Sequence, residues 1–505
     1  MMVNIKGTSS RGGKLRISQR DLVVFFLGAL ILPLYLIRKF TTSHAPEVED
    51  YPHNIRANAN ADSNDTPIDK DDGSIQQQTA IKKEQPILEI HDNIRKTATI
   101  QQKQQPLQTK KEYKTYPGFT TKPSVLCGGH TAESCDLCPQ GNGASWCNGE
   151  CEWINDECVR SSKLSHLHPD YFRITERYAF QPIMTNENNV YVNVIGVRSP
   201  FRGKDDEELY RFYQDEILFL GISSFEAFPL PPPNPYSAKF EKDYYIGMFP
   251  GFLHMMHKPE EHFPPTTKTI LMSQSDFNLD GPENYFKKHM NVEKIYDFVY
   301  SGGDQDVMND CVGWASYNKN FSFVREALEV MCSDEFNVTG VLVANKDKKD
   351  TRACTIPKSC EGKIVQTTFL ADQNKFFDYL SKARWAFLPQ VCDASPRVST
   401  QALSMNIPLL MNQNIMGGWK YMDEGKKLGL PIGEYFHDMS NFKDSLRRII
   451  DNTRGNNSPY KPLEFVKSNY GNERSGRRLY EFVKKHFGDR VNFPPGTTRL
   501  IPTGA

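Results

Sequence analysis

The sequence has no excess of charge of either sign. Its 505 residues include 61 Lys and Arg against 61 Asp and Glu, so the formal net charge at pH 7 is zero. Proteins that bind nucleic acid present a basic face to the phosphate backbone, and these totals imply no such face. We therefore expect no nucleic-acid partner.

Aliphatic patterning is scarce between residues 40 and 122. This segment is polar and contains glutamine-rich runs such as 76–78 and 101–105. A composition of this kind cannot bury enough apolar surface to offset the chain entropy lost on folding. The sequence therefore predicts a disordered stem over residues 40–122, with the globular part of the chain after it.

One long apolar run precedes the stem, and no small-residue cleavage site follows that run. Leu22–Ile37 spans sixteen residues, which is short for a plasma-membrane helix but adequate for the thinner bilayer of the early secretory pathway. Five basic residues precede the run and two follow it. This bias favours a cytosolic tail at 1–21 and a type II signal anchor at 22–37. A cleaved signal peptide is the alternative.

Six of the eleven cysteines are crowded into one short segment. They are Cys127, Cys135, Cys138, Cys147, Cys151 and Cys158. An even, dense cluster downstream of a signal anchor predicts three disulfides, and the sequence leaves all fifteen pairings open. The pair Cys135-x-x-Cys138 also suggests zinc, but the segment has a single histidine, His130, and lies on the oxidising side. The cysteine spacing, with Ala144-Ser-Trp before Cys147, resembles the small plexin-semaphorin-integrin (PSI) module. That resemblance implies a disulfide-rich module over 124–160 that braces a neighbouring domain.

The other five cysteines leave at least one thiol unpaired. They are Cys311, Cys332, Cys354, Cys360 and Cys392. Cys354 and Cys360 bracket a short loop and could close it, and Cys392 is the favoured free thiol. No histidine lies within thirty residues of Cys392 to act as a base. We therefore expect Cys392 to be a buried apolar side chain rather than a nucleophile.

Apolar runs typical of strands alternate with helical stretches through the remaining chain. The runs are 190–195, 217–221, 244–248 and 269–272, followed by 296–300, 338–343, 364–369, 385–388 and 407–411. Helical spacing of apolar residues is found at 321–331 and 374–383. This alternation indicates parallel sheets, and two sets of runs predict two Rossmann-like α/β domains with a cleft between them. We place these domains at 165–290 and 291–487, with a tail at 488–505.

The stretch Ala383–Trp419 carries the strongest functional signal. An apolar strand at 385–388 leads into a polar loop, and Ser395 and Pro396 suit the N-cap and first turn of a helix that continues over 397–405. A second strand follows the helix. In a doubly wound sheet, the N-terminus of such a helix faces the ligand crevice, which suits a negatively charged donor such as a sugar nucleotide.

Asp393 and Gln401 are separated by seven residues, and Ala402 and Pro408 follow them. This segment resembles the E-x7-E motif of GT-B glycosyltransferases, especially retaining family 4, over roughly Tyr296–Phe487. The resemblance implies that Asp393 lies at the donor sugar as a catalytic residue and that Gln401 binds the ribose. Both depart from the motif, because aspartate is one methylene shorter and glutamine is neutral, although it can accept from a ribose hydroxyl. The alternative is a buried βαβ unit whose polar residues only cap a helix.

The donor phosphates need cations and backbone amides. Gly302 and Gly303 directly follow a predicted strand and permit close approach of the backbone to a phosphate. In the resembled family, the matching loop leads to a basic residue that holds the pyrophosphate, and Lys319 fits that place best. Arg397 is a second phosphate candidate, and Ser395 stands at the same helix start. Both cations could instead be ordinary surface residues.

Two further candidates come from short patterns. Asp304-Gln-Asp306 is a D-x-D sequence, the metal-binding signature of GT-A glycosyltransferases, in which two acids hold a divalent cation on the diphosphate. The Asp393–Gln401 segment has no counterpart in that fold, so we favour GT-B and expect no cofactor and no metal. In retaining GT-B enzymes, a residue of the first domain faces the reacting sugar, and His254 is predicted for this role. A core or surface histidine is the alternative.

These features predict a single-pass type II glycosyltransferase of the Golgi or ER membrane with a lumenal catalytic domain. It would transfer a sugar from a nucleotide-sugar donor to a glycan or glycoprotein acceptor, with retention and without a metal. Sequons at Asn320 and Asn337 agree with a lumenal domain, although a glycan on Asn320 would crowd the site. The alternatives are a metal-dependent GT-A enzyme using Asp304 and Asp306, and a glycan-binding membrane protein without activity, because both motif acids are changed.

Overall fold

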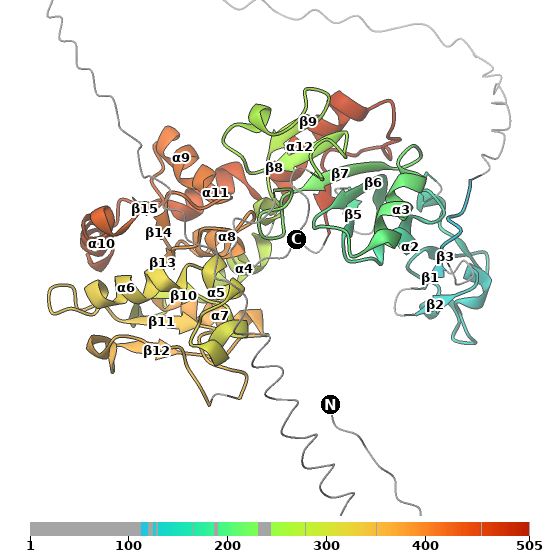
Figure 1. Ribbon diagram of the computed structural model, residues 1–505. Helices are drawn as coiled ribbons and strands as arrows, with labels where there is room; N and C mark the ends of the chain where they lie inside the picture. Colours follow the sequence, from blue (N-terminus) through green and yellow to red (C-terminus); the bar gives the residue numbers. More distant parts are fainter. Residues whose placement is uncertain are drawn as a thin grey trace, which may run out of the picture. The chain divides into compact units, whose positions relative to one another are not determined.

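The computed structural model describes residues 113–119, 125–127, 130–164, 166–185, 190–230, 244–277, 279–349, 351–455 and 457–503 (Figure 1). The predicted cytosolic tail at 1–21, the signal anchor at 22–37 and most of the stem lie outside these residues. Within the described ranges, no helix combines the length and apolarity needed to cross a membrane.

The end of the predicted stem is folded. Tyr116 is buried, its backbone N–H donates to the Tyr213 hydroxyl at 2.8 Å, and its ring packs edge-on against Phe119. Aromatic side chains supply the apolar burial that the glutamine-rich part of the segment lacks. The prediction of a stem up to residue 122 is therefore wrong at its end, because residues 113–119 pack on the first α/β domain.

The cysteine-rich module consists of two small antiparallel sheets held by disulfides. Its elements are β1 Val125–Leu126, β2 Thr131–Ala132, η1 Cys135–Leu137, η2 Gly143–Trp146, β3 Cys151–Ile154 and β4 Glu157–Arg160. The bridges join Cys127 to Cys138, Cys135 to Cys151 and Cys147 to Cys158. The six cysteines pack together as the core of the module, so the disulfides replace an aliphatic core.

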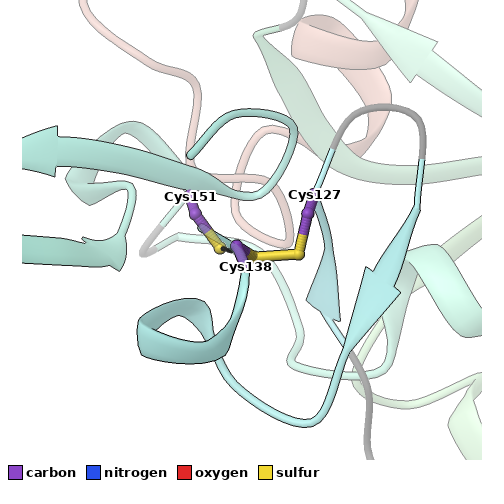
Figure 2. Close-up of side chains that lie close together, drawn as sticks. All are labelled: Cys127, Cys138 and Cys151. Carbon is purple, nitrogen blue, oxygen red and sulfur yellow. Dashed lines mark hydrogen bonds between the residues drawn. A yellow bond between two sulfur atoms is a disulfide. The ribbon is translucent and has the colours of Figure 1, made fainter. Parts of the chain in front are cut away.

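The zinc alternative for this module is wrong. The sulfurs of Cys127, Cys138 and Cys151 lie together (Figure 2), and Cys138 Sγ is 3.4 Å from Cys151 Sγ. Two different disulfides bring them there, so no thiolate is left to bind a cation. His130 Nε2 lies 2.9 Å from the Cys138 carbonyl oxygen, which fixes the ring on the backbone.

The first α/β domain is built on a six-stranded sheet with the order β16-β5-β6-β7-β8-β9. Its strands are β5 Phe180–Met184, β6 Tyr191–Val197, β7 Leu218–Ile222, β8 Gly251–His254, β9 Lys268–Leu271 and β16 Ile501–Pro502. Strands β6 to β9 are parallel, whereas β5 and β16 pair antiparallel at one edge. The helices α2 Tyr171–Thr175 and α3 Lys204–Tyr213 belong to this domain (Figure 1).

Two sequence predictions for this domain are wrong. Residues 244–248 form turns rather than the predicted strand, and the strand in this region is β8. The aromatic side chains of 244–248 pack into the core around Phe249 and Phe252, which explains why the run is apolar without being a strand. The segment 488–505 is not a tail, since β16 pairs with β5. The C-terminal residues thus complete the first sheet.

Helix α12 (Gly471–Phe487) also belongs to the first domain, although it follows the second domain in sequence. Its buried residues Leu479, Val483 and Phe487 pack in one cluster with Val194 and Leu220 of the first sheet. The predicted boundary at 487 is therefore also wrong. An amphipathic helix buries its apolar stripe wherever an uncovered sheet face is available, and sequence order does not fix which face.

The second α/β domain has a six-stranded, fully parallel sheet with the order β12-β11-β10-β13-β14-β15. Its strands are β10 Tyr296–Ser301, β11 Gly340–Val343, β12 Ile364–Gln366, β13 Ala383–Leu388, β14 Leu409–Asn412 and β15 Gly433–Phe436. Its helices are α4 Asp280–Lys288, α5 Trp314–Asn318, α6 Phe321–Met331, α7 Gln373–Ser381, α8 Arg397–Ser404, α9 Trp419–Lys427, α10 Met439–Arg454 and α11 Pro462–Asn469. Numbered from β10, this is the Rossmann order, with its switch point between β10 and β13.

Disulfides of the second domain differ from the predicted loop closure. Cys354 and Cys360 are not joined to each other: Cys311 pairs with Cys354, and Cys332 pairs with Cys360. Cys392 is free and buried, as predicted. Burial raises the pKa of its thiol to about 12, so it is a neutral apolar group at physiological pH.

Candidate active site

The carboxyl ends of the strands of both sheets meet at the junction of the two α/β domains. Three hydrogen bonds join residues that follow β7, β8 and β9 to residues that follow β13 and β14. They run from Ala394 N to Glu226 O (2.7 Å), from Trp419 Nε1 to Met255 O (2.8 Å) and from Ser275 N to Ser395 Oγ (2.8 Å). Ligands of open α/β sheets bind outside the carboxyl ends of the strands, so this junction is the place to look for a site.

Two of the predicted site residues form an ion pair beside the switch point. Lys319 ends α5 on the connection from β10 to β11, and Asp393 lies on the loop after β13. Lys319 Nζ is 2.7 Å from Asp393 Oδ2, and the side chains keep 25% and 16% of their surface exposed. The pair is thus partly shielded from water but still open to a ligand.

Two more predicted residues lie on one face of α8. Arg397 and Gln401 are four residues apart, and both line a cavity of about 460 Å³. Gln401 is nearly buried, and its Nε2 donates to Gln373 Oε1 at 3.2 Å. Residues of the first domain, including Met184 and Thr503, form the opposite wall of the cavity. The cavity therefore lies between the two domains and offers an amide pair and a guanidinium.

The electrostatic surroundings of Arg397 connect this cavity to the ion pair. Burial lowers the pKa of Arg397, the positive charge of Arg198 lowers it further, and the carboxylate of Asp393 opposes both effects. Arg397 therefore lies within electrostatic reach of Asp393 on its own domain and of Arg198 on the other.

Ser395 does not cap α8. The N-cap of this helix is Pro396, in extended conformation, and no side chain caps the helix. Ser395 is buried, and its Oγ accepts the hydrogen bond from Ser275 N. The predicted N-cap is off by one residue because the serine hydroxyl is occupied by the first domain. Its expected role in donor binding is not supported by this geometry.

The two glycines after β10 are required by packing. Gly302 N donates to Val343 O at 2.8 Å, which extends the ladder between β10 and β11, so this amide is not available to a phosphate. A Cβ at Gly302 would lie 2.7 Å from Asn345 Oδ1, and one at Gly303 would lie 2.9 Å from Ala315 Cβ. Close approach of neighbouring chain explains these glycines without a ligand.

The D-x-D sequence lies in η6 (Asp304–Asn309), and the side chain of Asp306 caps the following helix, α5. Its Oδ2 accepts from Ser316 N at 2.7 Å, in the first turn of α5. The side chain of Asp304 is not among those described. Among the described side chains, only the disulfide-bonded Cys127, Cys138 and Cys151 bring three potential metal ligands together. The metal alternative thus gains no support from Asp306.

His254 ends β8 and is buried rather than open to a substrate. Burial lowers its pKa to about 4, with a further contribution from the charge of Lys420, so the ring is neutral at physiological pH. Met256 N donates to His254 Nδ1 at 3.2 Å, which leaves the proton on Nε2. The geometry is that of a core histidine, the alternative raised above.

A buried polar cluster beside His254 was not predicted. Lys420 Nζ lies 2.7 Å from Asp276 Oδ2, with the two side chains 1% and 0% exposed. The Tyr421 hydroxyl donates to Asp276 Oδ1 at 2.8 Å, and Ser273 Oγ accepts from Lys420 Nζ at 3.2 Å. This cluster joins the end of β9 to α9, across the two domains. A charged residue directly after Gly417-Gly418-Trp419 was the only local signal for it.

Glu226 is a second residue that the sequence did not reveal. It follows β7 with a left-handed φ of 44°, and its carboxylate accepts from Trp314 Nε1 at 2.7 Å. Burial raises the pKa of this carboxyl group. The backbone carbonyl oxygen of Glu226 accepts a hydrogen bond from the backbone N–H of Ala394, the residue next to Asp393. Glu226 therefore positions the loop that carries the ion pair.

No protein-family model matches the chain, and no curated protein matches it significantly. Solved structures with partial likeness include the pneumococcal O-GlcNAc transferase GtfA, with 9% identity, a TM-score of 0.34, and 56% of this chain and 54% of that chain covered. A mutant of TarM from S. aureus is 10% identical with a TM-score of 0.38, and the match covers 55% of this chain and 52% of that chain. The α,α-trehalose 6-phosphate synthase of Burkholderia multivorans is 11% identical with a TM-score of 0.37, and the match covers 56% of this chain and 68% of that chain. The matched part thus spans about half the length of the first two chains.

Proposed function

We propose that this protein is a GT-B glycosyltransferase that moves a sugar from a nucleotide-sugar donor to a glycan or glycoprotein acceptor. The observation that carries the proposal is a row of polar residues formed by Asp393, on the loop before α8, and by Arg397 and Gln401, on one face of α8. This row begins at the switch point of a parallel sheet, where Lys319 pairs with Asp393, and it continues into a cavity between the domains. An extended, charged ligand such as a sugar nucleotide matches such a row.

The roles follow from the charges. A nucleoside diphosphate leaves with negative charge on its oxygens, and Lys319 and Arg397 are the cations beside the row that can stabilise it. Gln401, which lines the cavity, can accept from a ribose hydroxyl while Gln373 holds its amide. Asp393 accepts from hydroxyls of the donor sugar once Lys319 turns to the phosphates. Strand ends and a helix hold the backbone at these residues, so donor binding requires the Lys319 side chain to turn but no rearrangement of the backbone.

The finer parts of the proposal concern compartment and mechanism. Five disulfides in the described residues are typical of a chain that folds in an oxidising compartment, which supports a lumenal catalytic domain in the secretory pathway. We propose retention and a metal-independent reaction because the resembled family is retaining and because Lys319 and Arg397 supply positive charge for the diphosphate, the role of the metal ion in GT-A enzymes. A type II anchor at 22–37 completes the proposal.

The test is turnover of Lys319→Ala and Asp393→Ala with a panel of UDP-, GDP- and CMP-sugars. Thermal shift first selects the donors that bind, since a ligand at a hundred times its dissociation constant adds about 2.7 kcal/mol of stability. We expect each variant to lose at least tenfold in turnover with an unchanged melting temperature. The matched control is Lys382→Ala, which breaks an exposed pair with Asp378 of the same 2.7 Å length on the same domain. Wild-type rates for both site variants with every active donor would refute the site. Glycan binding without donor hydrolysis by the wild type would instead favour a lectin.

A further inference from the structure

A group of arginines lies on the first domain at the carboxyl end of β6. Arg198 directly follows this strand and is half-buried, and Arg202 follows it on the loop to α3. Both guanidinium groups lie against the ring of Tyr178, with Cζ to ring-centroid distances of 4.7 Å for Arg198 and 3.5 Å for Arg202. Arg198 Nε also donates to Tyr178 O at 3.2 Å. One aromatic ring thus contacts both cations.

The two guanidinium charges are not neutralised by an acid among the residues that the structure describes. Asp206, in the first turn of α3, is buried, and its carboxylate accepts from Arg177 Nη1 at 3.3 Å and from the backbone N of Arg202 at 2.9 Å. No ion pair joins a described carboxylate to Arg198 or to the Arg202 side chain. Two like charges held together without a counter-charge repel each other, and an anion relieves that repulsion.

Stacking on Tyr178 also gives the guanidinium groups a fixed orientation. An arginine laid on an aromatic face keeps its N–H groups at the edge of the stack, where they can bind a carboxylate, sulfate or phosphate through two parallel hydrogen bonds. Arg202 and Tyr178 are exposed, so this edge is open to solvent. The geometry therefore suits a solute anion rather than an internal ion pair.

We propose that Tyr178, Arg198 and Arg202 form a subsite for an acidic group on the acceptor sugar, with a carboxylate, a sulfate or a phosphate as the bound group. The inference rests on the proposed function and names the class of its acceptor. The donor phosphates already have Lys319 and Arg397 on the second domain. The acceptor must approach the donor sugar from the other side, and the first domain provides that side.

Electrostatic coupling places this subsite near the donor row. The positive charge of Arg198 lowers the pKa of Arg397, a cation that lines the interdomain cavity. An acidic acceptor on Arg198 and Arg202 would reduce the repulsion at Arg397 and would be steered toward the cleft by the combined charge. An uncharged acceptor gains neither effect.

The experiment compares two forms of one probe on the full-length protein saturated with UDP. The acidic probe is a hyaluronan tetrasaccharide, and the neutral probe is its carboxyl methyl ester, in which each carboxylate is converted to an uncharged ester. A sulfated chondroitin tetrasaccharide, which carries a sulfate in addition to the carboxylate in each repeat, tests whether an added sulfate strengthens binding. We expect the acid to bind at least tenfold more tightly than the ester, with an affinity that falls as salt is added. The double variant Arg198→Gln/Arg202→Gln should lose that preference and keep its affinity for UDP.

Two controls separate the subsite from folding and from the donor site. Arg211→Gln removes an exposed arginine of α3 that pairs with Glu207, and it should change nothing. If the double variant fails to fold by circular dichroism, the single variant Arg202→Gln, at an exposed position, takes its place and should lose at least threefold. Equal binding of acid and ester, or binding of neither, overturns the subsite. A loss of UDP affinity as large as the loss of acid affinity also overturns it and assigns the arginines to the donor. A wild type that prefers the acid but binds none of the UDP-, GDP- and CMP-sugars of the donor panel keeps the subsite and refutes the glycosyltransferase.

Discussion

Replacing Lys420 by methionine tests how the two α/β domains are held together. Lys420 and Asp276 are almost fully buried, with 2.7 Å between Nζ and Oδ2. Methionine keeps the approximate volume of the lysine stem but leaves the Asp276 carboxylate without its cation. Removing one partner of a buried pair costs roughly 3–5 kcal/mol, because the remaining charge stays desolvated. Asp276 still accepts from Ser273 N at 3.0 Å and from the Tyr421 hydroxyl. We therefore expect Lys420→Met to lower the free energy of unfolding by about 3 kcal/mol, the lower end of that range.

The assay is urea unfolding of four proteins: wild type, Lys420→Met, Asp276→Asn and the double variant. If the pair is coupled, the double variant should be more stable than the sum of the single losses implies, by about 2 kcal/mol or more. Lys382→Met is the matched control, because its pair with Asp378 has the same length but is 33% and 44% exposed. Exposed pairs of this kind contribute about 0–1 kcal/mol. A loss for Lys420→Met no larger than for Lys382→Met would refute the reasoning.

Three further predictions concern pH, glycosylation and metal. Since the pKa of His254 is lowered to about 4 in the fold, the unfolded chain takes up the proton first as pH falls from about 6.5. Stability should therefore decline between about pH 6.5 and pH 4 by up to roughly 3 kcal/mol, and His254→Phe should flatten that decline in pH-dependent melting curves. Asn337 is exposed and directly follows a turn, whereas Asn320 Nδ2 donates to Pro389 O at 2.9 Å. In a secretory host, Asn337→Gln should abolish the glycosidase-sensitive gel shift of this region and Asn320→Gln should not; the reverse result would place the glycan at the site. Transferase activity should persist in excess EDTA, and loss of activity that manganese restores, with Asp304→Ala equally inactive, would favour GT-A.

Elements with a strong local period were predicted well from the sequence. Helix α6 has the predicted bounds, 321–331, because Phe321, Val324, Leu328 and Met331 form an apolar stripe that needs no distant partner to be recognised. The five predicted strand positions of the second sheet all contain strands. Parallel strands covered on both faces are continuously apolar, and such runs are conspicuous in the sequence.

Elements that depend on distant partners were missed. The pairing of β16 with β5 joins residues more than three hundred positions apart, and two-residue strands have no period. Helix α12 has a clear apolar stripe, but the stripe does not say which of two sheets it will cover. The turns at 244–248 have the aromatic content of a strand, and only the packing of the first domain distinguishes them.

The predicted site residues also divide into those that local topology positions and those whose surroundings depend on the other domain. Lys319 and Asp393 are 74 residues apart, yet both follow neighbouring parallel strands, so the Rossmann topology alone brings them to one edge. His254 and Ser395 also stand at carboxyl ends of strands, but there the opposite domain closes over them, and the first is 4% exposed and the second 7%. A sequence can assign a residue to an edge of a sheet, but it cannot tell which part of that edge the other domain will cover. Accessibility at the junction therefore decides which candidates can contact a substrate, and by that criterion Asp393 remains a candidate while His254 belongs to the core.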